Sequence, residues 1–221
     1  MLKGPMIEAF VGEYASGKSE VSINRALMLA STNQRVTIVD LDTVEPFYTL
    51  RPIKKVLEDK GLTVVCWDTK DTMGLGEAGS LLKPEMRWVL RRGGHIVLDV
   101  GYGAHGAKIF NLVEGASDHP ALKIFAVVNT TRPMTSDYQR IVQYLQTLGR
   151  LDGIVHNSHL AELTDRDTII SGLSEVRKAA EQLGVPIIST CVDVDKIPEV
   201  GELELDHPVW PIQRFMQKNI W

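Results

Sequence analysis

The chain has few cysteines and no excess of positive charge. Cys66 and Cys191 are the two cysteines among 221 residues, and their spacing matches neither a paired-cysteine metal motif nor a redox motif. A disulfide framework is not expected from such a pair. The 24 lysines and arginines are scattered and are outnumbered by 28 acidic residues, which gives a net charge of -4. This balance provides no electrostatic footprint for nucleic acid or for an anionic membrane.

Long apolar runs are also missing. The apolar stretch near the N-terminus is interrupted by Glu8, and no run approaches the roughly 20 apolar residues of a membrane-spanning helix. No repeat, low-complexity tract or linker rich in proline and glycine divides the chain. With 44% hydrophobic residues, its length is enough for one well-filled core. We therefore expect a cytoplasmic protein with a single domain over residues 1–221.

Short apolar runs rich in β-branched residues alternate with segments of helical period. The runs IVLDV and IFAVV are apolar on both faces, which is typical of central parallel strands covered by helices on each side. We predict an α/β fold of three layers, with a mainly parallel sheet of about seven strands between two layers of helices. The predicted strands are 6–11, 36–39, 62–66, 95–100, 123–128, 153–155 and 185–189.

Three segments carry apolar residues at helical spacing. Residues 23–30 and 138–148 would each place one apolar face on the sheet, and Gly149 is a plausible C-cap of the second segment. In the last segment Ile212, Phe215, Met216 and Ile220 would share one helical face. We expect this segment to form a C-terminal helix docked on the core.

The most specific motif lies where the first predicted strand meets a helix. Residues 12–19 read GEYASGKS and match GxxxxGK[ST], the P-loop pattern, in the strand-to-helix setting that the motif requires. Glycines let the backbone N–H groups turn inward, and the helix N-terminus adds partial positive charge for phosphates. Lys18 is expected to contact the β- and γ-phosphates, and the Ser19 hydroxyl to ligate Mg²⁺. The predicted nucleotide-binding residues of this segment are Gly12, Glu13, Tyr14, Ala15, Ser16, Gly17, Lys18, Ser19 and Glu20.

Acidic residues end two of the predicted strands. Asp99 follows the run HIVL, with Gly101 and Gly103 just beyond it, and Asp40 and Asp42 follow the run VTIV. The carboxyl ends of parallel strands meet in the crevice where ligands bind, so these side chains are expected near the magnesium ion. The predicted metal residues are Ser19, Asp40, Asp42 and Asp99, and the predicted catalytic residues are Lys18 and Asp42, the latter to position water. A strand-end cap for Asp99 and a solvated loop acid for Asp42 are the alternatives.

In this order, the loop and the two acidic strand ends resemble the MinD/ParA/CobQ-like branch of SIMIBI-type P-loop ATPases. The stretches VNTTRP at 128–133, GIVHN at 153–157 and VPIISTCVD at 185–193 extend the resemblance over most of residues 6–193. It implies a nucleotide-dependent homodimer with switch loops after the acidic strands. By resemblance, Asn157 would read the adenine and residues 192–197 would pass beside the base. Residues 43–51 and 68–84 are candidate nucleotide-sensitive loops.

One position departs from that family. Its signature lysine directly follows the first glycine of the loop and reaches the phosphates of the partner subunit, whereas Glu13 stands there in this chain. A carboxylate would be repelled by phosphate. Either Glu13 points away and pairs with a basic residue, or hydrolysis is slow and depends on a partner or another residue.

The choice of base rests on a missing motif. GTP-binding proteins commonly present an NKxD box, but Ser158, His159 and Leu160 follow Asn157, so the acid that would read guanine is absent. Asn157 can also be a simple turn residue. We therefore expect an Mg²⁺-dependent ATP-binding protein, a slow ATPase that acts as a nucleotide-dependent switch, with a further protein partner left open. The alternatives are an ATP-dependent synthetase of the dethiobiotin or cobyrinate diamide type and a non-hydrolysing nucleotide sensor.

Overall fold

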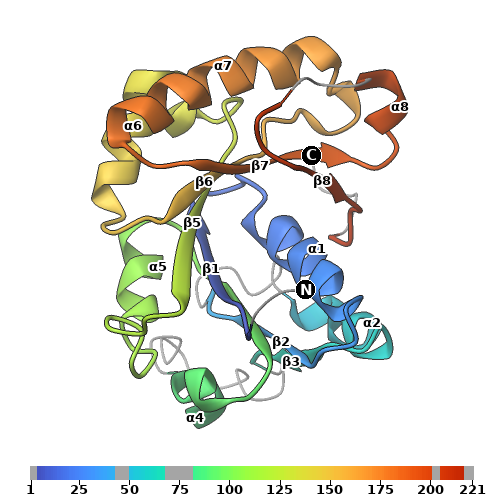
Figure 1. The fold of residues 1–221 in the computed structure, drawn as a ribbon, viewed down its shortest axis with the longest axis vertical. Coiled ribbons are helices and arrows are strands. Elements are labelled where there is room, and N and C mark those ends of the chain that lie inside the picture. The colour runs from blue at the N-terminus through green and yellow to red at the C-terminus, as the bar shows by residue number, and fades with distance from the viewer. Residues whose placement is uncertain (1–3, 43–49, 68–81, 201–204, 217–221) are drawn as a thin grey trace.

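The computed structural model describes residues 4–42, 50–67, 82–200 and 205–216. Its centre is one sheet of eight parallel strands in the order β3-β2-β4-β1-β5-β6-β7-β8 (Figure 1). The strands are β1 (Ile7–Gly12), β2 (Val36–Asp40), β3 (Thr63–Val65), β4 (His95–Asp99), β5 (Leu122–Val128), β6 (Gly153–His156), β7 (Ile187–Asp193) and β8 (Val209–Ile212).

Helices cover both faces of the sheet, which confirms the predicted three-layer α/β fold. Helices α1 and α2 contribute to the apolar core on one face, and α5, α6 and α7 to the core on the other. The helices are α1 (Lys18–Ala30), α2 (Lys54–Asp59), α4 (Pro84–Arg87), α5 (Gly103–Phe110), α6 (Tyr138–Thr147), α7 (Arg166–Leu183) and α8 (Ile197–Val200). As expected, α6 is followed closely by Gly149, which has a left-handed φ of 82°.

Strand β1 lies in the middle of the sheet and is buried along its whole length. Glu8 interrupts its apolar sequence, yet this side chain is also buried, because Arg25 of α1 donates from Nε to its carboxylate at 2.8 Å. The chain leaves β1 between β4 and β5, where the connections diverge to opposite halves of the sheet. Ligands of open α/β sheets bind at such a switch point.

The predicted C-terminal helix is wrong. Residues 209–212 form β8, an eighth strand that pairs in parallel with β7, where about seven strands were expected. Burial alternates residue by residue, with Trp210 and Ile212 buried between exposed neighbours, so the true period is two. Pro208 and Pro211 lack the N–H that a helix needs, and proline is tolerated at a sheet edge. Phe215 still packs on the core, and residues 217–221, including Ile220, lie outside the described residues.

Candidate functional site

Residues 12–19, the phosphate loop, join the end of β1 to the start of α1. Gly12 has a φ of 154°, and a Cβ there would lie 2.5 Å from the Val127 carbonyl oxygen. Gly17 has a φ of 89°, and a Cβ there would collide with the Asn157 side chain. Both positions therefore require glycine for conformation and for space. This close packing fixes the course of the loop against the ends of β5 and β6.

The Lys18 side chain folds back over the phosphate loop. It is buried, and its Nζ donates to the Glu13 carbonyl oxygen at 3.0 Å. Burial lowers the pKa of this ammonium group, while the charges of Asp99 and Asp42 act in the opposite direction. The arrangement places one desolvated cation beside the loop backbone, where a phosphate oxygen could replace the carbonyl as its partner.

Asp99 and Asp40 occupy paired positions on the neighbouring strands β4 and β2. Asp99 is buried; the Ser22 hydroxyl donates to its Oδ1 at 3.4 Å, and within the described part of the chain its Oδ2 has no hydrogen-bond partner. Burial raises the pKa of Asp99 to about 7, although a hydrogen bond from Ser19 and the charge of Lys18 oppose the change. A buried carboxylate oxygen without a donor is suited to a cation or a metal-bound water.

Asp40 has a different environment. Its two oxygens accept backbone N–H groups, from Asp42 at 3.0 Å and from Leu50 at 3.2 Å. Burial and the nearby Asp99 raise its pKa to about 8. Asp42 lies against Gly101, so it joins the end of β2 to the segment after β4. Asp40 thus organises the backbone around Asp42, and its predicted role as a metal residue stays a prediction.

A magnesium site here would need ligands besides protein. Among the residues that the structure describes, no group of three or more His, Cys, Asp or Glu side chains is arranged to hold a metal ion. Magnesium in nucleotide sites typically keeps several waters and binds phosphate oxygens with one or two protein ligands. The pairing of Ser19 with Asp99 supplies a hydroxyl and a carboxylate of this kind.

Glu13 points away from the phosphate loop. Its Oε1 accepts the Met134 N–H at 3.1 Å, and its Oε2 accepts the Thr135 hydroxyl at 2.8 Å, both in the 3₁₀ helix η4 (Pro133–Thr135). The first of the two sequence-based readings is therefore right about direction, but the partners are a backbone amide and a hydroxyl where a basic residue was expected. The side chain is buried, so it ties the loop to the segment after β5.

This tether predicts a stability effect. We expect Glu13→Ala to lower the free energy of unfolding by about 1–3 kcal/mol, because the Met134 N–H loses a buried acceptor and the Thr135 hydroxyl keeps only the Asn129 carbonyl oxygen. Glu13→Gln keeps one acceptor oxygen and should lose less stability. Glu13→Lys should lose the most, because an ammonium group would then face the N–H and O–H donors of η4. Urea denaturation measures these differences. Glu114→Ala, at a surface ion pair, is the control, and equal stability of Glu13→Ala and wild type would show that the tether contributes nothing.

A cavity of about 50 Å³, the base cavity, lies where the first turn of α1 meets the segment after β6 and the end of β7. The lining residues are Glu20, Asn157, Ser158, His159, Ala161, Thr164, Ile169, Cys191, Val192, Asp193, Ile212 and Arg214. The sequence predicts Asn157 and residues 192–197 beside a base, and the structure brings Asn157 and Asp193 to this one cavity. Burial lowers the pKa of His159 to about 4, so its ring is neutral near pH 7.

Two polar residues of this cavity already have structural partners. Asn157 donates from Nδ2 to the Ser16 carbonyl at 2.8 Å, which supports the phosphate loop. The Glu20 carboxylate accepts the backbone N–H groups of Phe215 and Met216 at 3.0 and 2.7 Å, which holds the segment after β8 on the first turn of α1. A contact of either residue with nucleotide stays a prediction.

Sequence reasoning missed two parts of the site. Arg214 lines the base cavity, with its Nε 2.9 Å from Asp193 and its Nη2 3.0 Å from Glu162. No motif surrounds this arginine, and the predicted C-terminal helix would have placed it elsewhere. The rings of Tyr14 and Tyr102 meet edge to face at 5.4 Å, which joins the phosphate loop to the segment that follows Asp99.

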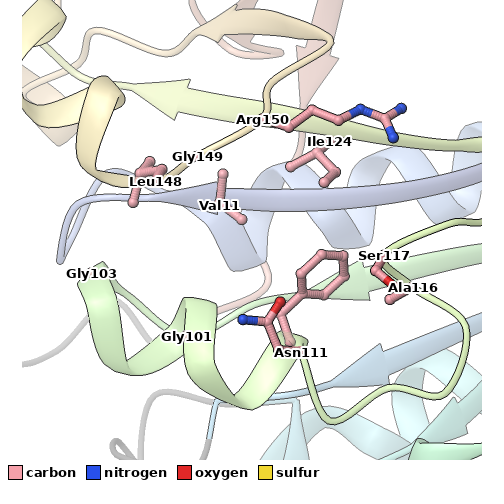
Figure 2. A pocket seen from close by; sticks show the side chains of 11 residues that line it. Val11, Gly101, Gly103, Asn111, Ala116, Ser117, Ile124, Leu148, Gly149 and Arg150 are labelled. Carbon is pink, nitrogen blue, oxygen red and sulfur yellow. The ribbon is translucent and has the colours of Figure 1, made fainter.

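A further cavity of about 260 Å³, the rear cavity, adjoins that same segment on the α5 and α6 side of the sheet. Figure 2 shows Val11 and Ile124 of the central strands on one side of it and Asn111 on the other. Gly101 and Gly103, which follow Asp99, form part of its lining. A molecule bound in this cavity would touch backbone next to the carboxylate site.

The structure describes only part of the two predicted nucleotide-sensitive loops. Residues 43–49 and 68–81 lie outside the described residues, so most of the loops 43–51 and 68–84 is untested. No helix within the described ranges is long and apolar enough to cross a membrane.

Comparison with known proteins finds similarity in structure and none in sequence. No protein-family model matches the chain, and no curated protein matches it. Among solved structures, FtsY of Thermotoga maritima, a cell division protein, aligns with a TM-score of 0.59 and 15% identity over 87% of this chain and 63% of its own. The signal recognition particle receptor FtsY of Elizabethkingia anophelis, in complex with GDP, has a TM-score of 0.56 and 16% identity over 87% of this chain and 58% of its own.

The signal recognition particle 54 kDa protein of Aeropyrum pernix, also in complex with GDP, has a TM-score of 0.56 and 18% identity over 85% of this chain. The chain spans between 41% and 63% of the lengths of these three proteins. At such identities the likeness concerns the fold. It shows that the chain has the P-loop nucleoside-triphosphatase fold, and it does not distinguish the MinD/ParA branch of the sequence-based resemblance.

Proposed function

We propose that this protein binds ATP with magnesium at the phosphate loop and hydrolyses it slowly as a nucleotide-dependent switch. The observation that carries the proposal is the convergence of Lys18 and Asp99 at the end of β1. Lys18 has its ammonium over the loop backbone, and the buried Oδ2 of Asp99 has no hydrogen-bond partner among the described residues. Asp99 pairs with Phe10 of β1, and Glu13, whose carbonyl oxygen accepts the Lys18 ammonium, directly follows β1, so both groups lie at the same end of this strand. A triphosphate with a divalent cation complements both.

The residues present fit a magnesium ion. Ser19 would ligate it directly and Asp99 would hold its waters, with Asp42 against Gly101, two residues after Asp99. The ion would neutralise charge on the β- and γ-phosphates. Lys18 would stabilise the same phosphates, and Asp42 would orient water. Asp40 would act mainly by holding the backbone of Asp42 in place.

The base cavity favours adenine over guanine. The carboxylates among its described lining residues are Glu20 and Asp193. Glu20 is occupied by backbone N–H groups, and Asp193 by Arg214. Guanine requires an acceptor for its N1–H and its exocyclic amine, whereas adenine does not. Two of the similar solved structures contain GDP, and that nucleotide is a property of those proteins.

The slow rate follows from Glu13. Because its carboxylate is held by η4, this position supplies no cation to the phosphates of a partner subunit. We expect a homodimer whose pairing depends on the bound nucleotide, with hydrolysis that is weak unless another protein stimulates it.

Isothermal titration with ATP, GTP and ADP, with and without magnesium, tests the proposal. We expect ATP to bind more tightly with magnesium than without it, and more tightly than GTP. A coupled assay of ADP release should then show slow turnover, and light scattering should show a larger mass with ATP than with ADP. Binding without any ADP release would favour the nucleotide sensor, and no binding of any triphosphate would refute the proposal.

A second candidate is an ATP-dependent synthetase of small molecules. It is favoured by the rear cavity, which has room for a second substrate beside Gly101 and Gly103. In that case ADP release would rise on addition of small carboxylic acids, while a switch would not respond to them.

A further inference from the structure

We propose that Arg214 determines which base this site accepts, because it occupies Asp193 and prevents that carboxylate from binding guanine. This inference rests on the proposed nucleotide function and assigns base selectivity to a residue outside any nucleotide-binding motif.

Asp193 is well placed to read a base. It ends β7 and lines the base cavity together with Asn157, which contacts the phosphate loop. Its Oδ1 accepts the backbone N–H of Asp195 at 3.0 Å, and its Oδ2 lies 2.9 Å from the Nε of Arg214. If the arginine were absent, Oδ2 of this cavity-lining residue would lose its partner.

Arg214 is held at this position by its neighbours in the chain. Asn24 of α1 bonds the backbone of Gln213 twice, accepting its N–H at 2.9 Å and donating to its carbonyl at 2.8 Å. Glu20 accepts the N–H of Phe215 on the other side. The backbone is therefore fixed on both sides of Arg214, so its side chain reaches Asp193 from a constrained origin.

The two carboxylate partners of Arg214 have different exposure. The Glu162 side chain is 63% exposed, whereas that of Asp193 is 22% exposed. Exposed ion pairs contribute little, so the contact with Glu162 opens more easily. The closed cavity, about 50 Å³, is smaller than the roughly 150 Å³ that accommodates benzene. A purine can therefore enter only when the lining residues move, and Arg214 can leave the exposed Glu162 while it stays on Asp193.

The chemistry then distinguishes the purines. A released Asp193 would accept the N1–H and the exocyclic amine of guanine, in the way that carboxylates accept paired donors. Adenine has an acceptor at N1, which a carboxylate repels. With Arg214 in place the carboxylate is neutralised and occupied, and the two donors of a guanine would lack a carboxylate acceptor in the site.

Four variants test the inference by titration with ATP and with GTP. Arg214→Gln and Arg214→Ala should raise the ratio of GTP affinity to ATP affinity by at least about tenfold. Arg214→Ala combined with Asp193→Asn should lose that gain, because the released group is then an amide. Asp193→Asn alone should leave ATP the preferred nucleotide. Arg177→Ala, which removes a surface pair with Asp206, is the matched control and should leave the ratio unchanged.

If Arg214 had a purely structural role, its replacement would weaken the binding of ATP and GTP equally. An unchanged ratio of GTP to ATP affinity in folded Arg214→Gln would overturn the inference while the proposed function stands. Thermal denaturation identifies the folded variants. A wild-type protein that prefers GTP would overturn the inference together with the assignment of adenine. A wild-type protein that binds no triphosphate would refute both proposals.

Discussion

Lys18→Ala is expected to weaken ATP binding by about 100-fold or more. The ammonium group is buried at the phosphate loop, so its loss leaves triphosphate charge without a desolvated partner, and such losses cost about 2–5 kcal/mol. The folded protein should tolerate the change, because burial already lowers the pKa of this group and its removal relieves a desolvation cost. Titration calorimetry measures the affinity.

The control for this variant is Lys178→Ala, which removes an exposed ammonium paired with Glu175. It should bind ATP like wild type. Thermal denaturation without nucleotide distinguishes lost binding from lost folding. Unchanged ATP affinity in a folded Lys18→Ala protein would mean that triphosphate does not bind at residues 12–19.

Asp99→Asn should abolish the enhancement of ATP binding by magnesium and at the same time stabilise the nucleotide-free protein. The pKa of Asp99 is about 7 in the folded state, above its ordinary 3.8. Between these two pH values the folded state binds more protons than the unfolded state. The free energy of unfolding therefore falls as pH rises from about 4 to 7, and above pH 7 the loss due to Asp99 stays constant. Asparagine carries no charge and escapes this cost.

We therefore expect the stability gain of Asp99→Asn to be small at pH 5 and on the order of 1–3 kcal/mol at pH 8, measured by urea denaturation. Asp152→Asn provides the opposite control. Lys123 and Arg150 pair with that carboxylate, and hydrogen bonds from the Ile124 N–H and these side chains lower its pKa, so its replacement should destabilise the protein at pH 8. A pH-independent effect of Asp99→Asn would show that its carboxylate is not protonated near neutral pH.

The sequence predicts the parts of the site that depend on local pattern. The phosphate loop and Asp99 each lie at the carboxyl end of an apolar strand, and parallel strands bring such ends together regardless of the details of packing. The parallel sheet follows from strands that are apolar on both faces, such as residues 95–100.

The remaining features depend on contacts distant in sequence. Glu13 finds its partners 121 and 122 residues away, and no local rule indicates which way its side chain turns. The apolar residues in 209–220 fit both a helical period and the two-residue period of a strand. The strand forms because of the proline positions and because β7 offers an edge for pairing. Asp40 lies at the predicted place, but the backbone groups that occupy its oxygens include Leu50, ten residues on.

The fastening of the last described residues to α1 has a consequence for biosynthesis. Asn24 precedes its partner Gln213 by 189 residues, and Glu20 precedes Phe215 by 195 residues. Helix α1 therefore leaves the ribosome long before the residues that complete its surroundings. Contacts of such separation form late, because a long stretch of chain must be ordered first. Nascent fragments that end before β8 would therefore carry the whole GEYASGKS sequence without a finished site, and nucleotide binding would await synthesis of β8 and the residues directly after it.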